Sequence, residues 1–303
     1  MDDLRHACAT VADRARSVAV VPGTIPAYAA TLPPDSDAAP PSAPPTPAER
    51  EARAAHWLTM DAINFGSGWF PTLRKRGTLS GYNTIAAGLG EHFDHGGWTA
   101  AQLATLDAAT LAPVLGQDPG HELMALYAAS LRDLGQQVTA AHDGRFAAVA
   151  DAAQGSAVAL ARCLGGWPSF ADRSPYEELE LPFLKRAQIA AADLHRAGVA
   201  HFTDLPALTM FADNLVPHVL RLDGVLRFDP ELVARIDRGE LIAHDSAEEV
   251  EIRACAVYAV ELLVAAAPAG GLSAATVDQI LWQRGGQPRY KASRRHRSRC
   301  TAY

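Results

Sequence analysis

The residue types most suited to catalysis lie between positions 185 and 253. Asp213 is a lone carboxylate at the end of an apolar run, in a pattern that predicts a helix over 205–222. A buried carboxylate is unfavourable unless it is hydrogen-bonded, ion-paired or used in a reaction. Asp213 is therefore a candidate catalytic residue, although a salt bridge or a helix cap would also explain it. Pro217 is expected to bend this helix.

Basic and amide side chains precede Asp213 on a predicted helix over 185–193. Lys185 and Gln188 are three residues apart and share one face of this helix, with Arg186 beside them. An exposed basic face is the usual structure around a Lys-Arg pair. Here the neighbouring side chains are almost all apolar, which leaves little polar surface to be solvated.

A further helix is predicted from Glu248 to Ala267. It is apolar on nearly all sides after Arg253, which is typical of a buried helix. Glu261 is the only charge in that apolar part. We expect it to form a structural ion pair with an arginine.

Aromatic side chains follow a glycine-rich turn. A helix that includes residues 56–65 breaks at Gly66-Ser67-Gly68, and Trp69-Phe70-Pro71 comes directly after. Because glycine lets the backbone approach a ligand closely, this arrangement can wall a pocket for a flat molecule. A helix end with its aromatic side chains in the core explains the pattern equally well.

Helices must position these residues, and the sequence predicts a mainly α fold with few short strands. Two capping boxes, at Thr46–Glu49 and Thr99–Gln102, indicate helix starts. Short β-like pieces are expected around 72–79. The predicted helices run over 2–20, 46–65, most of 99–164, 185–193, 205–222, 248–267 and 273–282.

One domain over 1–303 is predicted, interrupted by a proline-rich loop. Residues 33–47 contain seven prolines among small and acidic residues. Such a composition cannot pack a core, so we expect a disordered surface loop there.

The charge distribution limits the classes of partner. The chain of 303 residues is 49% hydrophobic and has a net charge of −7, which does not favour nucleic acid as a partner. Residues 289–299 contain six Arg or Lys and no acid, so the remainder carries −13. This basic segment predicts a local anion site or a solvated tail.

The cysteines and apolar runs indicate a cytoplasmic protein. The four cysteines are widely spaced and form no metal-binding or disulfide pattern. The first residues lack the apolar core of a signal peptide, and no run is suited to crossing a membrane. We expect neither a metal nor a membrane as a partner.

Several short motifs occur in an order typical of one family. From about residue 56 to position 303 the chain resembles the queuosine salvage family. The matching segments are Asp61-Ala-Ile-Asn-Phe65, Ser80-Gly-Tyr82, Phe183-Leu-Lys-Arg-Ala-Gln188, Thr209-Met-Phe-Ala-Asp213 with Pro217, Glu249-Val-Glu-Ile-Arg253, Val260-Glu-Leu262, Leu281-Trp282 and His296-Arg-Ser-Arg-Cys300 with Tyr303.

The resemblance implies an all-helical fold akin to helix-hairpin-helix DNA glycosylases, with no metal or organic cofactor. It also implies hydrolysis of the N-glycosidic bond of queuosine 5′-monophosphate, a small-molecule nucleotide, to queuine and ribose 5-phosphate. Asp213 falls on the catalytic aspartate and Lys185 on an active-site lysine. The residues expected to bind substrate are Asp61, Asn64, Phe65, Trp69, Tyr82, Lys185, Arg186, Gln188, Phe211, Trp282, His296, Arg299 and Tyr303, with His296 and Arg299 assigned to the phosphate.

Two departures from the family pattern leave alternatives open. Gly66-Ser67-Gly68 stands as an insertion before Trp69, and Gln283 rather than Asp follows Trp282. These departures change a wall of the pocket, so an N-glycosidase of another purine or 7-deazapurine nucleoside or nucleotide is an alternative. A non-catalytic base-binding or scaffold protein is a further one. A nucleic-acid glycosylase is disfavoured by the acidic body.

Overall fold

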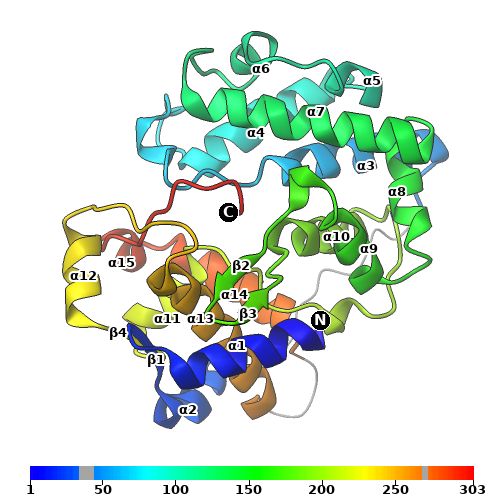
Figure 1. Ribbon diagram of the computed structural model, residues 1–303. Helices are drawn as coiled ribbons and strands as arrows, with labels where there is room; N and C mark the ends of the chain where they lie inside the picture. Colours follow the sequence, from blue (N-terminus) through cyan, green and yellow to red (C-terminus); the bar gives the residue numbers. More distant parts are fainter. Residues whose placement is uncertain (34–43, 268–271) are drawn as a thin grey trace.

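The computed structural model describes residues 1–33, 44–267 and 272–303 (Figure 1). Most of the proline-rich segment at 33–47, predicted as a disordered loop, lies outside these residues. The described chain is mainly helical, as predicted, and its strands are two short antiparallel pairs. In the described parts of the chain, no helix is both long and apolar enough to cross a bilayer.

The helices between residues 47 and 142 gather in the upper part of Figure 1. The capping boxes at Thr46–Glu49 and Thr99–Gln102 are both formed, which confirms these two helix starts. Short local signals of this kind need no distant partner, so the sequence alone predicts them. These helices are α3 (Pro47–Ala62), α4 (Gly81–Asp94), α5 (Ala100–Leu103), α6 (Ala108–Val114) and α7 (Glu122–His142).

A second group of elements surrounds the buried helix α13 (Ala247–Ala266), which packs against α1, α2, β1, α11 and α14. Glu261 of α13 pairs with Arg5 at 3.0 Å, which confirms the expected ion pair. The helices of this group are α1 (Asp2–Arg14), α2 (Ile25–Ala29), α11 (Val216–Leu222), α12 (Pro230–Asp237), α14 (Ala274–Gly285) and α15 (Pro288–Lys291). Connecting helices are α8 (Phe146–Ala152), α9 (Ala157–Leu164) and α10 (Lys185–Arg196), with 3-10 turns η1 (Pro22–Thr24), η2 (Phe70–Thr72), η3 (Pro168–Phe170) and η4 (Leu205–Ala207).

The strands pair segments far apart in the sequence. β1 (Val18–Val20) pairs with β4 (Leu226–Phe228), with Val18 opposite Phe228. β2 (Ser174–Tyr176) and β3 (Leu179–Leu181) form a hairpin. The C-terminal segment, residues 292–303, then passes between the two groups of helices (Figure 1).

Three sequence predictions are wrong in their secondary structure. The first helix ends at Arg14 instead of reaching residue 20, because Glu251 accepts the backbone N–H groups of Arg16, Ser17 and Val18 and so takes them out of the helix. No strand forms in 72–79, a described segment in which Gln117 exchanges hydrogen bonds with the backbone of Arg74. The helix predicted over 205–222 is the largest error.

Residues 208–215 form an irregular loop, and α11 begins only at Val216. Pro217 therefore lies in the first turn of a helix, where its missing N–H is harmless, and it bends nothing. The 208–215 loop is not helical because side chains from three helices bind its backbone. Gln188 of α10 accepts the N–H of Thr209, and Asp278 of α14 accepts the N–H of Phe211. Arg253 of α13 donates to the carbonyl of Ala212.

Candidate functional site

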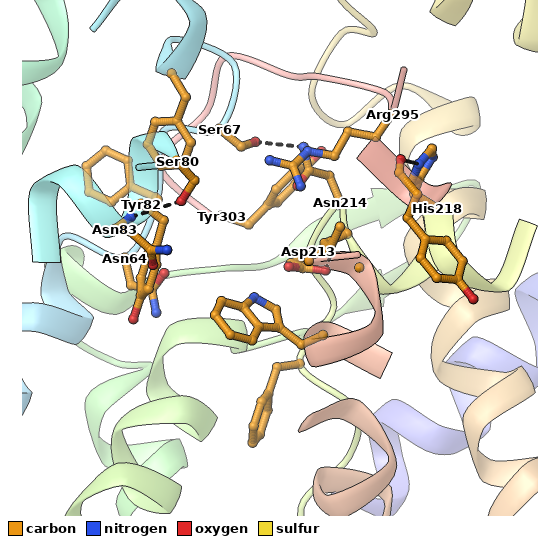
Figure 2. Close-up of a pocket in the computed structure, with 18 of the residues that line it drawn as sticks. Asn64, Ser67, Ser80, Tyr82, Asn83, Asp213, Asn214, His218, Arg295 and Tyr303 are labelled. Atoms are coloured by element: carbon orange, nitrogen blue, oxygen red, sulfur yellow. Dashed lines mark hydrogen bonds between the residues drawn. The ribbon is translucent and has the colours of Figure 1, made fainter. Parts of the chain in front are cut away.

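A cavity of about 1030 Å³ lies between the two groups of helices, a size suited to a nucleotide. Its walls come from the end of α3 and the start of α4, from α10, from the 208–215 loop, from α14 and from the C-terminal segment. Figure 2 shows Asp213 and Arg295 on one side of it and Asn64, Tyr82 and Asn83 on the other.

Asp213 projects into this cavity from the 208–215 loop (Figure 2). Its Oδ1 accepts the backbone N–H groups of Leu215 at 2.8 Å and Val216 at 3.0 Å. The side chain is half-buried, so a carboxylate oxygen is available to a ligand. Asp213 thus holds the backbone at the start of α11 and also faces the cavity.

The backbone around Asp213 is fixed on both sides. Gln188 exchanges hydrogen bonds with the amide and hydroxyl of Thr209, and Asp278 Oδ1 accepts the N–H of Phe211 at 3.0 Å. Arg253 Nε donates to the carbonyl of Ala212, also at 3.0 Å. Such a set of buried hydrogen bonds limits how far Asp213 can move.

Arg253 also connects Asp213 to Lys185. The guanidinium binds both carboxylate oxygens of Asp172, at 2.9 and 2.8 Å, and Asp172 accepts the backbone N–H of Lys185 at 2.9 Å. Both partners of this ion pair are inaccessible to solvent. Burial would lower the pKa of Arg253, but Asp172 and Glu249 outweigh it and raise the pKa.

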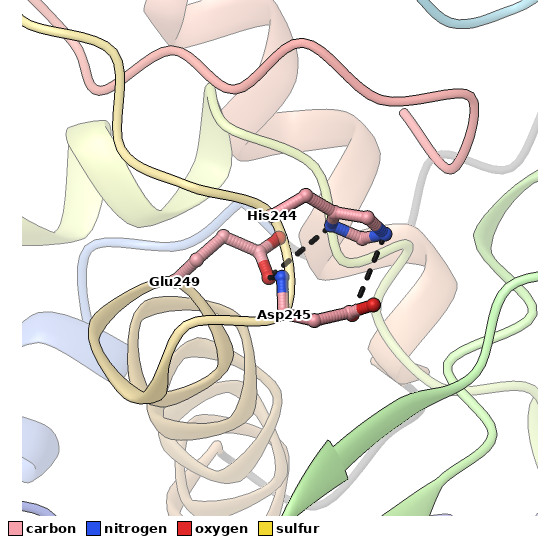
Figure 3. A group of neighbouring side chains, drawn as sticks. All are labelled: His244, Asp245 and Glu249. Carbon is pink, nitrogen blue, oxygen red and sulfur yellow. Dashed lines mark hydrogen bonds and ion pairs between the residues drawn. The ribbon is translucent and has the colours of Figure 1, made fainter.

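Glu249 extends this buried charge network toward His244 (Figure 3). The two nitrogens of His244 lie 3.4 Å from carboxylate oxygens of Asp245 and Glu249. Burial opposes charge on His244, yet Cys300 and Glu249 raise its pKa to about 10. These three side chains are close enough to share a cation, but a doubly paired imidazolium accounts for their arrangement.

Lys185 reaches the cavity from the first turn of α10. Its Nζ donates to the backbone carbonyl of Asn64 at 2.8 Å and to the side-chain oxygen of Asn64 at 3.2 Å. Burial lowers its pKa to about 8, although Asp213 raises it. An ammonium has three donors, so one N–H remains for a ligand.

A pair of carboxyls lies beside the same wall. Asp193 lines the cavity and pairs with Arg196 at 2.5 Å; burial raises its pKa to about 6 despite that arginine. Asp61 lies behind it, and neither of its carboxylate oxygens has a hydrogen-bond partner among the described residues. Burial and Asp193 raise the pKa of Asp61 well above its usual value.

Basic residues of the C-terminal end line the opposite part of the cavity, namely Lys291, Arg294, Arg295 and Arg297. Arg295 is half-buried, and among the described residues it has neither a hydrogen bond nor an ion pair. Burial lowers its pKa, while Asp213 raises it. A half-buried guanidinium without an ion pair is suited to binding a phosphate group.

The structure brings together only part of the predicted site. Trp282 is the most exposed of the cavity-lining residues that were predicted, at 43%. It meets Tyr82 edge to face at 5.9 Å between ring centroids, which leaves both rings beside the cavity. The predicted residues that line the cavity are Asn64, Phe65, Tyr82, Lys185, Phe211, Asp213, Trp282 and Tyr303.

The remaining predicted residues lie outside the lining. Arg186 is fully buried, with its guanidinium over the rings of Phe65 and Phe170. Arg299 pairs with Glu122 at 3.4 Å and lies over the Trp69 ring. The predicted residues outside the lining are Asp61, Trp69, Arg186, Gln188, His296 and Arg299.

His296 and Ser67 hold the loop through Asn214. The Asn214 side chain donates to the carbonyl of His296 and to the hydroxyl of Ser67, each at 3.0 Å. Figure 2 shows the bond to Ser67. Gly68 touches the carbonyl of Ser298, where a Cβ would lie 2.3 Å from the oxygen. The Gly-Ser-Gly insertion thus joins the C-terminal segment to the 208–215 loop.

The cavity residues that sequence reasoning missed include Asp193, Arg196, Asn214, Asp278 and Arg295. One of them, Asp278, carried a usable signal. Asp278 precedes Trp282 by four residues on one helix and therefore shares its face. Arg295 lies in the six-cation segment but had no feature that separated it from its neighbours.

The fold and the site together define an α-helical protein with a deep, nucleotide-sized cavity that holds a positioned carboxylate and an unpaired arginine. A family model described as queuosine salvage protein matches residues 45–303. The chain belongs to this family.

The names of similar proteins agree with this family assignment. A Sphaerobacter thermophilus protein, named queuosine 5′-phosphate N-glycosylase/hydrolase, is 36% identical over 266 residues, which cover 84% of this chain and 82% of that protein. A Nematostella vectensis protein of the same name is 29% identical over 231 residues, 71% of this chain and 67% of the relative. A Schizosaccharomyces pombe protein is 36% identical over 123 residues, 39% of this chain and 36% of its own length.

Proposed function

We propose that this protein hydrolyses the N-glycosidic bond of queuosine 5′-monophosphate and releases queuine and ribose 5-phosphate. The observation that supports this most is the position of Asp213, in a nucleotide-sized cavity with Lys185 and Arg295 among the other lining residues. The relatives' names supply the substrate.

Cleavage of an N-glycosidic bond builds positive charge on the sugar. A carboxylate beside the sugar stabilises that charge in the transition state. In our proposal Asp213 has this role, and it accepts the proton of the water that attacks C1′. The two backbone N–H groups on Oδ1 hold its direction, so little reorganisation is needed during the reaction.

The other groups bind the two ends of the nucleotide. Arg295 takes the 5′-phosphate, because it is a cavity-lining guanidinium that forms no ion pair or hydrogen bond within the described chain. Lys185 has an N–H left for the base, whose flat ring can stack against Tyr82 and Trp282. In this proposal Arg295 of the basic segment binds the phosphate, instead of Arg299, to which the sequence prediction assigned it.

The test is the variant Asp213→Asn. An amide oxygen can still accept the N–H groups of Leu215 and Val216, so the loop should keep its form. We expect turnover of queuosine 5′-monophosphate, followed by chromatography of released queuine, to fall by about 10²–10³ or more. Asp94→Asn, at an exposed position of α4, is the control and should be fully active. Unchanged turnover in Asp213→Asn would disprove the proposed role.

A panel of GMP, 7-deaza-GMP and queuosine 5′-monophosphate tests the substrate separately. Hydrolysis of queuosine 5′-monophosphate above the other two supports the proposal. Hydrolysis of another nucleotide with queuosine 5′-monophosphate left intact would favour the alternative glycosidase. Binding without any turnover would favour a non-catalytic protein.

A further inference from the structure

Asp278 is a buried carboxyl in the cavity wall that the proposed reaction does not yet use. It lies on α14, one turn before Trp282, and only 6% of the residue is exposed. Its Oδ1 accepts the N–H of Phe211, two residues before Asp213. Its Oδ2 has no hydrogen-bond partner among the described residues.

Two of the carboxyls that line the cavity, Asp213 and Asp278, have different surroundings. Asp213 is half-buried and accepts two backbone N–H groups, whereas Asp278 is buried and accepts one. Burial and the nearby Asp213 raise the pKa of Asp278 well above its usual value, against the opposite effects of the Phe211 N–H, Lys185 and Arg196. Of two carboxyls in such different surroundings, one can act as the general acid and the other as the base.

Two other charged side chains near Asp278 in the lining already have protein partners. Asp193 pairs with Arg196 at 2.5 Å, and Lys185 donates twice to Asn64. Asp61 lies outside the cavity lining. Asp278 is thus a buried carboxyl of the lining that has one oxygen without a partner in the described chain.

Resting on the proposed glycosidase activity, we infer that Asp278 is the general acid that protonates the departing base. The C1′–N bond breaks and its electron pair goes to the base, while the Oδ2–H proton of Asp278 moves to a ring nitrogen of that base. A water oxygen bonds to C1′ and its proton passes to Asp213. Proton exchange through solvent then returns Asp278 to its acid form.

A base of the 7-deazapurine class makes this step necessary. Carbon replaces N7 in such a base, so the ring nitrogen that purine glycosidases can protonate is missing. The negative charge of the leaving group must be neutralised at another edge. General acids contribute about 10²–10⁴ in rate where the leaving group is poor.

The experiment compares two leaving groups in the variant Asp278→Asn. The amide oxygen still accepts the Phe211 N–H, but the side chain has no acidic proton to transfer. The substrates are queuosine 5′-monophosphate and 4-nitrophenyl β-D-riboside 5-phosphate, whose nitrophenolate leaves without a proton. We expect kcat for the nucleotide to fall about 10²–10⁴-fold and kcat for the nitrophenyl substrate to fall less than about tenfold.

Retained cleavage of the nitrophenyl substrate also shows that the variant is folded. Asp213→Asn is the comparison and should lose activity on both substrates. Equal losses on both substrates in Asp278→Asn, or no loss on the nucleotide, would overturn the acid role alone. If the wild-type protein cleaves the nitrophenyl substrate but no nucleotide, the proposed function fails instead.

Discussion

Two groups of buried or half-buried charges lie next to each other in this protein, and they differ in how completely they are paired. Arg253 and Asp172 are inaccessible to solvent and bind each other through two hydrogen bonds. Arg295 and Asp278 line the cavity and keep donor or acceptor groups without partners in the described chain. The paired group determines where the backbone lies, and the unpaired group is left for a ligand.

The paired group serves both proposed active-site residues at once. Arg253 binds the carbonyl before Asp213, and Asp172 binds the amide of Lys185. A change in this pair should therefore alter stability and the relative position of Asp213 and Lys185 together. The unpaired residues should instead affect binding or turnover with little effect on folding.

The largest expected effect on stability comes from breaking the paired group. In Asp172→Asn the fully buried guanidinium of Arg253 loses the carboxylate to which it donates two hydrogen bonds, and Glu249 remains as a more distant partner at 3.8 Å. We expect the free energy of unfolding, measured by urea denaturation, to fall by about 3–5 kcal/mol. The matched control is Glu178→Gln, which removes an exposed partner of Arg14 and should change it by less than about 1 kcal/mol. A loss below about 1 kcal/mol in Asp172→Asn would contradict this role.

An intermediate effect is expected from removing an unpaired charge. Arg295→Gln should raise KM for queuosine 5′-monophosphate about tenfold to a hundredfold, since a hydrogen bond to a charged group contributes about 1.5–3 kcal/mol. The unphosphorylated nucleoside should be cleaved as before, and the urea midpoint should not change.

Arg299→Gln is the matched control for Arg295, from the same segment. Arg299 pairs with Glu122 outside the cavity lining, so KM should stay within about twofold of wild type, the range of a weak surface pair. Equal effects of the two substitutions, on nucleotide and nucleoside alike, would show that Arg295 does not bind the phosphate.

The same contrast explains which features the sequence could predict. The capping boxes at Thr46 and Thr99 involve residues three positions apart, so they are visible in the sequence. The buried helix α13 and its ion pair follow from a long apolar run with one charge. The positions of Asp213 and Lys185 followed from the family resemblance.

The 208–215 loop could not be predicted in the same way. Its apolar residues suit a helix, but Gln188, Arg253 and Asp278 bind its backbone from up to 67 positions away in the chain. The choice between Arg295 and Arg299 also depends on tertiary structure, because both lie in one basic run. Local patterns therefore predicted helices, whereas long-range hydrogen bonds decided the site.

The smallest expected effect comes from an ion pair that is neither fully buried nor next to the cavity. Arg5 and Glu261 meet at 3.0 Å with about a quarter of each side chain exposed, 25% and 24%. Arg5 also donates to the carbonyls of Ala207 and Leu208 at the start of the 208–215 loop, and these bonds do not need Glu261. Glu261→Gln should therefore lower the free energy of unfolding, by urea denaturation, by no more than about 1 kcal/mol. The Arg5–Glu261 pair is partly exposed, whereas the Arg253–Asp172 pair is fully buried. A loss in Glu261→Gln as large as that in Asp172→Asn would therefore show that burial does not decide how much an ion pair stabilises this fold.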